Sequence, residues 1–204
     1  MIASGRRTIP TLRYIKRQSP DTITVYLMRP ERYADLDLAA VPIHDNPPDL
    51  SNVVQTVGAL HAVTPETLHV ARQQWTGEFV HLPRPLVGVV LGGNTKHGSY
   101  TMQEWHDLLS NAQRLAGTGT LLVTTSRRTP AEVEAMYEPL LQSPNRLYRW
   151  SKDKENPYLG MLACADALIV TGDSMSMCAE AAVSDTRAEA RLAPSRLPPP
   201  ARST

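Results

Sequence analysis

The sequence predicts an α/β protein built from Rossmann-like parallel sheets that are arranged in two halves. Short apolar runs alternate with capped helical segments four times between residues 86 and 182, a pattern typical of a doubly wound parallel sheet. A weaker alternation covers residues 1 to about 62, which we interpret as a broken half of the same kind. Polar turns follow several of these runs, at the positions where α/β proteins bind ligands.

The composition excludes several classes of protein. The chain has 204 residues, 42% of them hydrophobic and 20% charged, which suits a soluble globular protein of one or two domains. A formal net charge of +1 gives no electrostatic reason to expect nucleic-acid binding. No apolar run approaches the ~18 residues of a membrane span. The only cysteines, Cys164 and Cys178, lie in apolar surroundings and no signal peptide is visible, so we expect a cytoplasmic protein.

Residues 1–82 form the predicted first half. Apolar residues three positions apart, with a proline near the start, indicate a helix over residues 8–17. A second helix is expected over residues 64–75, with Thr64 as its cap and Pro65 in its first position. Runs rich in β-branched and other apolar residues predict four short strands, at residues 1–3, 22–28, 36–43 and 53–57.

Residues 83–182 form the predicted second half, after a linker that contains Pro83 and Pro85. Four buried runs predict parallel strands at residues 86–91, 120–124, 146–150 and 167–170. Each is followed by a helix, expected at residues 101–115, 129–141, 156–165 and 174–182. The first of these helices begins with Thr101 and has Glu104 three residues later, the spacing of a capping box.

The last residues, 183–204, have a different composition. They are rich in alanine, arginine and proline, contain no aromatic residue and show no sustained hydrophobic period. Three consecutive prolines, 198–200, exclude a helix or a central strand there. We therefore expect a disordered tail.

The stretch ADALIVTGDSMSMCAEAA, residues 165–182, predicts a strand, a tight turn and a helix. The polar residues at and after this turn are Asp173, Ser174, Ser176 and Glu180. Free N–H groups and the helix dipole favour an anion at such a turn, serine hydroxyls add donors, and Glu180 can accept from a ribose hydroxyl. The alternative is that Asp173 or Ser174 serves only as a helix cap.

Two further turns are expected at the same edge of the second sheet. After residues 86–91 come Gly92, Gly93, Asn94, Thr95 and Lys96. Their spacing does not fit a phosphate loop, because Ser99 stands where that motif needs lysine. After residues 120–124 come Ser126, Arg127 and Arg128, and a guanidinium group suits a phosphate. A simple solvated loop is the alternative for the glycine-rich turn, and adjacent arginines alternate in direction, so we expect one of the two to face a ligand.

Other chemistry finds no support in the sequence. The six histidines show no metal-ligand spacing, and neither GxSxG nor HExxH is present. We therefore expect no metal and no cofactor, and no catalytic residue can be named.

Several strings together resemble a family of bacteria and plants that is named for mitochondrial fission, or elongated mitochondria. In the second half these strings are GGNTK, TTSRRT, ENPY and ADALIVTGDSMSMCAEA, and in the first half ASGRRT and GALHAVTPE. The resemblance covers roughly residues 1–182. It implies a similarity to GT-B glycosyltransferases, which have two Rossmann-like halves that face a cleft. The sequence departs from the family pattern at both ends, and this predicts a two-half fold that is incomplete at both ends.

The resemblance also implies a ligand and its contacts. In GT-B enzymes the carboxyl half binds a nucleotide sugar, whose diphosphate rests on a helix start and whose ribose is held by a glutamate. Carried over, Ser174 and Ser176 match the diphosphate turn and Glu180 the ribose position. Gly92 and Gly93 match the first turn of that half, and Asn156 lies in the loop before a matched helix. Two functions follow as alternatives: sugar transfer from a nucleotide sugar to an unknown acceptor, or a non-enzymatic protein that binds a partner or an organelle surface.

Overall fold

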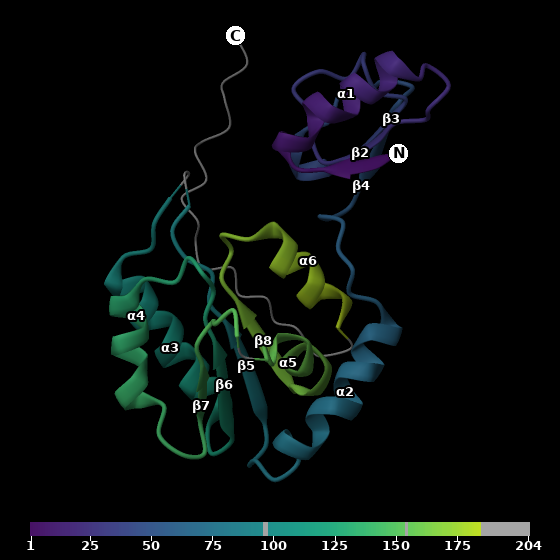
Figure 1. Ribbon diagram of the computed structural model, residues 1–204. Helices are drawn as coiled ribbons and strands as arrows, with labels where there is room; N and C mark the ends of the chain where they lie inside the picture. The colour runs from purple at the N-terminus through teal and green to yellow at the C-terminus, as the bar shows by residue number, and fades with distance from the viewer. Residues whose placement is uncertain (96–97, 154, 185–204) are drawn as a thin grey trace. The chain divides into compact units, whose positions relative to one another are not determined.

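The computed structural model describes residues 1–95, 98–153 and 155–184 (Figure 1). The chain divides into two compact units, Met1–Ala62 and the residues from Val63 onward. Each unit contains one four-stranded sheet in which every strand pairs in parallel with its neighbours. The predicted α/β class with two Rossmann-like parallel sheets is therefore confirmed.

The first unit has its strands in sequence order, β1-β2-β3-β4. Its elements are β1 (Ile2–Ser4), α1 (Ile9–Gln18), β2 (Val25–Leu27), β3 (Leu38–Pro42) and β4 (Val53–Thr56), with short 3-10 helices at Arg6–Thr8 and Ile43–Asp45. The apolar residues that α1 buries, Ile9 and Leu12, pack with Tyr26 and Ala39 of the sheet. All four predicted strands are present, although β2 is shorter than the expected 22–28.

A carboxylate joins three segments of this unit. Asp37 Oδ2 accepts hydrogen bonds from the backbone N–H and the hydroxyl of Thr24, both at 2.7 Å, just before β2. Its Oδ1 accepts from Lys16 Nζ of α1 at 2.9 Å. These bonds, first of all the one from the Thr24 backbone, lower the pKa of Asp37 to about 2 from an ordinary 3.8.

We expect the first unit to lose stability as the pH falls from about 4 to about 2. Because the pKa of Asp37 is lower in the folded state, the unfolded chain takes up a proton first. The contribution of the carboxylate is complete above the unfolded pKa and is lost as the pH falls through the folded one. The NMR signals of β2 and β3 amides would follow this loss. Asp37→Asn should remove this part of the pH dependence, and an equal dependence in both proteins would contradict the assignment.

The second unit has the strand order β7-β6-β5-β8, with β5 and β6 in the centre. Its strands are β5 (Leu86–Val90), β6 (Thr120–Thr124), β7 (Arg146–Tyr148) and β8 (Ala167–Val170). Its helices are α2 (Pro65–Phe79), α3 (Met102–Ala116), α4 (Ala131–Tyr137) with a 3-10 turn at Glu138–Leu140, α5 (Tyr158–Cys164) and α6 (Met175–Val183). The predicted capping box opens α3: Glu104 Oε2 accepts from the Thr101 N–H at 2.7 Å.

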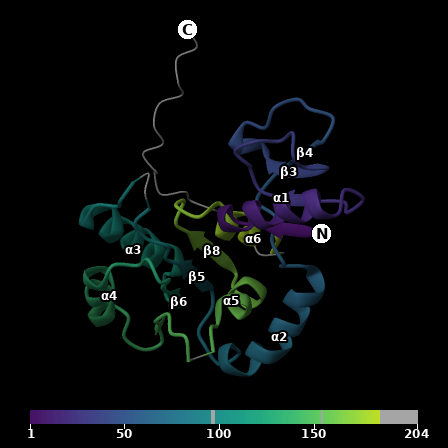
Figure 2. The ribbon, with the colours of Figure 1, turned by 45° about the horizontal axis from the view of Figure 1, so that its top comes forward.

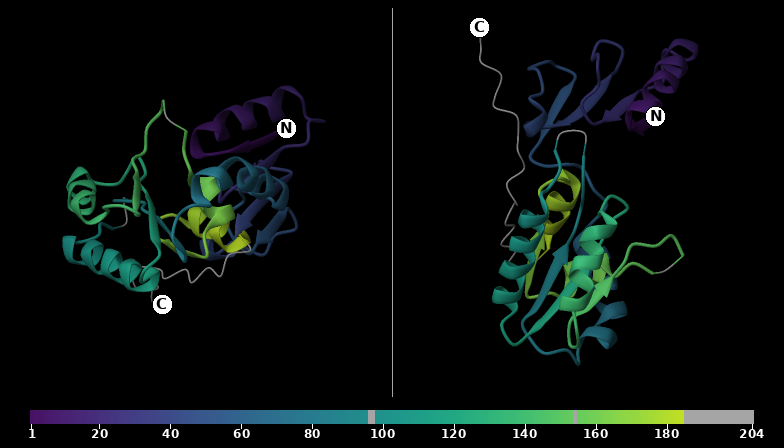
Figure 3. Two further views of the ribbon diagram at one scale, coloured as in Figure 1. Left: turned by 90° about the horizontal axis from the view of Figure 1, so that it is seen from below. Right: turned by 90° about the vertical axis from the view of Figure 1, so that its left-hand side faces the viewer.

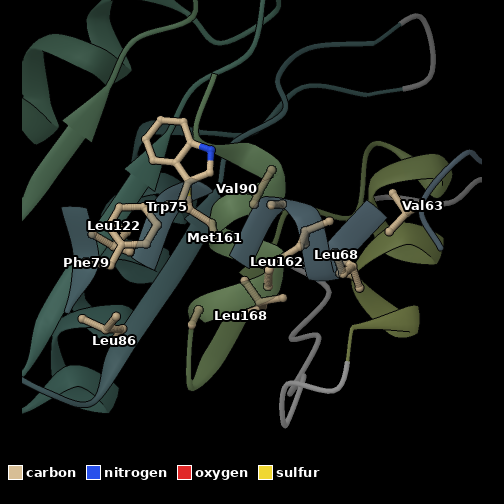
Figure 4. Close-up of a cluster of buried hydrophobic side chains, with 14 of the residues drawn as sticks. Val63, Leu68, Trp75, Phe79, Leu86, Val90, Leu122, Met161, Leu162 and Leu168 are labelled. Carbon is tan, nitrogen blue, oxygen red and sulfur yellow. The ribbon is translucent and has the colours of Figure 1, made fainter. Parts of the chain in front are cut away.

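Helices cover both faces of this sheet, as the continuous apolar runs of its central strands require. On one face α3 and α4 pack against Val87, Val89 and their neighbours (Figure 2). On the other face α2 and α5 form the core together with Leu86 and Val90 (Figure 4). Each strand of the pair β5 and β6 is buried along its whole length.

Helix α2 belongs to the second unit, and this corrects the expected boundary between residues 82 and 83. Trp75 and Phe79 of α2 belong to the same buried cluster as Met161 and Leu162 of α5 (Figure 4). The two helices approach so closely that a Cβ on Gly160 would overlap the Trp75 side chain. The physical reason for the correction is therefore the apolar face of α2, which is buried against α5.

At the far end, α6 continues to Val183 and Ser184 is buried, with its hydroxyl donating to the Ala181 carbonyl at 2.6 Å. The predicted tail thus begins no earlier than residue 185, and residues 185–204 lie outside the described residues. Among the residues that the structure describes, no helix is both long enough and apolar enough to cross a bilayer.

Candidate functional site

Three turns meet at the carboxyl edge of the second sheet. They follow β5, β6 and β8, which are adjacent and parallel, so their carboxyl ends lie at one edge. The sequence predicts this arrangement for residues 92–96, 125–127 and 173–176. The segments on either side of residues 96 and 97 run side by side (Figure 3, right), and Thr95 forms an antiparallel bridge with Gly98. Lys96 itself lies outside the described residues.

Side chains from the turns after β6 and β8 hold the glycine-rich turn in place. The Gly92 N–H donates to Thr171 Oγ1 at 2.7 Å, and the Gly93 N–H donates to Asp173 Oδ2 at 3.1 Å. The Gly92 carbonyl accepts from the hydroxyls of Ser126 at 2.9 Å and Thr129 at 2.6 Å. The N–H groups of both glycines therefore bind protein atoms in this structure.

The same contacts explain why glycine stands at positions 92 and 93. A Cβ on Gly92 would overlap the carboxylate of Asp173, and a Cβ on Gly93 would overlap the backbone carbonyl of Arg128. The turns after β5, β6 and β8 thus pack against one another with no room for a side chain between them. Asn94, the next residue, is exposed.

Asp173 is the charged centre of this edge. Its side chain is only 5% exposed and forms an ion pair with Arg128 Nη2 at 2.7 Å. The guanidinium of Arg128 is 42% exposed, so the pair spans the boundary between the interior and solvent. Burial, and after it the negative charge of Asp173, raise the pKa of the Tyr100 hydroxyl to about 12. Asp173 therefore acts on three other segments of the edge through contacts that include the Gly93 N–H and Arg128 at its Oδ2, whereas its Oδ1 is buried without a hydrogen-bond partner among the described residues.

The start of α6 carries the remaining predicted residues. Ser174 is the N-cap of the helix: its hydroxyl oxygen accepts from the Met177 N–H at 3.4 Å. The capping role considered for Ser174 is therefore present. Ser176 is exposed. Glu180 Oε2 accepts from the Tyr158 hydroxyl of α5 at 2.6 Å. Burial, helped by this bond to Glu180, raises the pKa of Tyr158, so that its hydroxyl stays protonated and donates.

A pocket of about 510 Å³ opens beside these turns, and we call it the arginine pocket. Its lining residues come from the ends of β5 and β6 and the turns after them, from the segment between β7 and α5, and from α5 and α6: they are Val90, Leu91, Thr124, Thr125, Ser126, Arg127, Arg128, Trp150, Asn156, Tyr158 and Met177. Of the predicted site residues, Ser126, Arg127 and Asn156 line it. Gly92, Gly93, Asp173 and Glu180 contact residues that line it.

The arginine pocket is cationic and partly aromatic. Arg127 and Arg128 both line it, against the expectation that one of the two would, and no Asp or Glu is among its described lining residues. The Arg127 guanidinium lies 6.0 Å from the centre of the Trp150 ring. The backbone N–H of Trp150 donates in turn to Thr125 Oγ1 at 2.9 Å and fixes this position of the chain. Such a pocket suits an anion that also carries a flat or apolar part.

Trp150 and Tyr158 are the aromatic lining residues that were not predicted from the sequence. Trp150 lies two residues after the end of β7 and is the last residue of the strand predicted at 146–150, so its place at the carboxyl edge was available from that prediction. No cluster of three or more metal-ligating side chains occurs among residues 1–95, 98–153 and 155–184.

Comparison with known proteins shows which family this chain resembles. A family model described as Mitochondrial fission ELM1 matches residues 1–190. The mitochondrial fission protein ELM1 of Arabidopsis thaliana is 32% identical over 208 residues, which cover 89% of this chain and 48% of that protein. An uncharacterized protein of Rickettsia prowazekii (strain Madrid E), RP120, is 26% identical over 220 residues, which cover 90% of this chain and 62% of that protein. The chain thus spans about half to three fifths of the length of these two relatives.

Proposed function

Because this chain belongs to the Mitochondrial fission ELM1 family, we propose that its second unit binds a nucleotide sugar in the arginine pocket. The observation that carries the proposal is the lining of that pocket, in which Arg127 lies against Trp150, Arg128 lies nearby, and no carboxylate is among the described lining residues. A nucleoside diphosphate combines the two matching features, a charged diphosphate and a flat base. The resemblance of the family to GT-B glycosyltransferases supports the same ligand.

The activity that follows is transfer of the sugar to an acceptor. The bond between the sugar and the diphosphate breaks in such a transfer, and negative charge develops on the leaving diphosphate. Arg127 and the N-terminal end of α6, which begins after Ser174, can stabilise that charge. Ser126, Asn156 and Glu180 would orient the ligand, whereas Asp173 would act through Arg128 and the glycine turn.

Tryptophan fluorescence provides the test, because the chain has three tryptophans in different surroundings. Trp75 and Trp105 are 8% and 1% exposed, whereas Trp150 is 37% exposed and lines the pocket. We expect saturable quenching by at least one of the uridine, adenosine, guanosine and thymidine diphosphates. Trp150→Phe should remove the quenching, while calorimetry still detects the ligand.

The competing function is that of a non-enzymatic partner-binding protein. The name of the plant relative, a mitochondrial fission protein, favours it. If none of the four nucleoside diphosphates quenches Trp150 or releases heat on titration, the nucleotide proposal is overturned and partner binding takes its place.

A further inference from the structure

A second hollow, which we call the helix groove, lies between α2 and the start of α5. It has a volume of about 460 Å³. Its lining residues are Glu66, Thr67, Val70, Ala71, Gln74, Trp75, Glu155, Asn156 and Leu159. We propose that the helix groove holds the sugar of the nucleotide sugar whose diphosphate occupies the arginine pocket, and that this sugar carries no negative charge. The proposal rests on the nucleotide binding proposed above.

The position of the groove follows from the topology. Helix α2 leads into β5 and α5 leads into β8, so both helices begin near the carboxyl edge of the sheet and run toward its other edge. Glu66 and Leu159, in the first turns of these helices, therefore lie on the side of the unit where the arginine pocket opens. Asn156 lines both hollows. A ligand that passes Asn156 can reach from one into the other.

The two hollows have opposite charge. The charged residues that line the helix groove are Glu66 and Glu155, and no Lys, Arg or His is among its described lining residues. The Gln74 amide donates to Glu155 Oε1, which fixes the direction of that carboxylate. A phosphate is thus favoured in the arginine pocket and disfavoured in the groove, which orients a ligand that spans both.

The groove also has the mixture of groups that a sugar requires. The carboxylates of the groove only accept hydrogen bonds. Asn156 Oδ1 already accepts from the Tyr158 N–H at 3.0 Å, and the NH₂ group of Asn156 can donate to a ligand. A sugar hydroxyl can donate to Glu66 or Glu155 and accept from Asn156, whereas the two carboxylates would repel an anionic sugar. Val70, Trp75 and Leu159 supply an apolar wall for the C–H faces of the ring.

The experiment compares two ligands in calorimetric titrations of the 204-residue chain. One is the nucleoside diphosphate that binds best among the uridine, adenosine, guanosine and thymidine forms, and the other is its glucose ester. The measured quantity is the ratio of their two affinities. In the double variant Glu66→Gln/Glu155→Gln we expect the affinity for the ester to fall about tenfold, with the affinity for the nucleoside diphosphate unchanged. Glu132→Gln, an exposed position on α4 at the opposite face of the sheet, is the matched control and should leave the ratio unchanged.

The outcomes separate the two proposals. If the nucleoside diphosphate binds and the ratio is the same in the wild type and the double variant, the groove does not hold the sugar, while the nucleotide proposal stands. If no nucleoside diphosphate binds, both proposals fail together. An equal loss of affinity for both ligands in the double variant also overturns the inference, because the carboxylates would then act on the nucleotide rather than on the sugar.

Discussion

Replacement of Asp173 by alanine should destabilise the second unit by about 2–4 kcal/mol. The change removes the acceptor of the Gly93 N–H, which is buried, and leaves Arg128 without its partner. An unsatisfied buried N–H costs about 1–3 kcal/mol. The ion pair adds less than a fully buried one, about 1 kcal/mol, because Arg128 is 42% exposed and partly solvated.

Tryptophan fluorescence during urea unfolding would measure this loss for the second unit alone. All three tryptophans, Trp75, Trp105 and Trp150, lie after Ala62, so the first unit does not contribute to the signal. Asp173→Asn is the matched comparison, because an amide oxygen still accepts from Gly93 and only the charge is lost. We expect its effect to be less than half that of alanine. An unfolding free energy of Asp173→Ala within about 0.5 kcal/mol of wild type would show that the three turns are held by other contacts.

The strands and helices of the second unit were predictable because their signals are local. The run LVGVV of β5 is buried at every position. Because a central parallel strand is covered on both faces, its sequence is a continuous apolar run and can be recognised as a strand. Thr101 and Glu104 form their capping box within four residues of chain. The unit to which α2 belongs could not be predicted from a local signal. It depends on the packing of Trp75 against Gly160, which is 85 residues away in sequence, and no sequence pattern marks that contact.

The candidate site shows the same division. The strand order that brings residues 92, 126 and 173 to one edge follows from parallel pairing, and the sequence argument used it. The use of the Gly92 and Gly93 N–H groups by Thr171 and Asp173 joins residues about 80 positions apart. Glycine-rich turns that bind an anion and glycine-rich turns that pack against a carboxylate have the same composition. Only the positions of the Thr171 and Asp173 side chains separate these two roles.

The loss of Arg127 should have the largest effect on ligand binding. Arg127→Ala is expected to weaken the binding of a nucleoside diphosphate by about ten- to a hundredfold, which corresponds to the 1.5–3 kcal/mol of a hydrogen bond to a charged group. Arg128 is held by Asp173, whereas Arg127 forms no ion pair with any residue that the structure describes and lies against Trp150. The positive charge of its guanidinium is therefore available to bind a diphosphate.

The measurement is a calorimetric titration of Arg127→Ala, Arg127→Lys and Arg149→Ala. Arg127→Lys should fall between wild type and alanine, because an ammonium keeps the charge but loses the planar pair of donors. Arg149 is a matched control: it lies next to Trp150 in sequence, and its guanidinium pairs with Glu134 at 3.5 Å and Glu138 at 2.8 Å, away from the pocket lining. Its loss should change the affinity less than twofold. If Arg127→Ala and Arg149→Ala weaken binding equally, the attraction comes from the general charge of the surface, and Arg127 has no specific contact with the diphosphate.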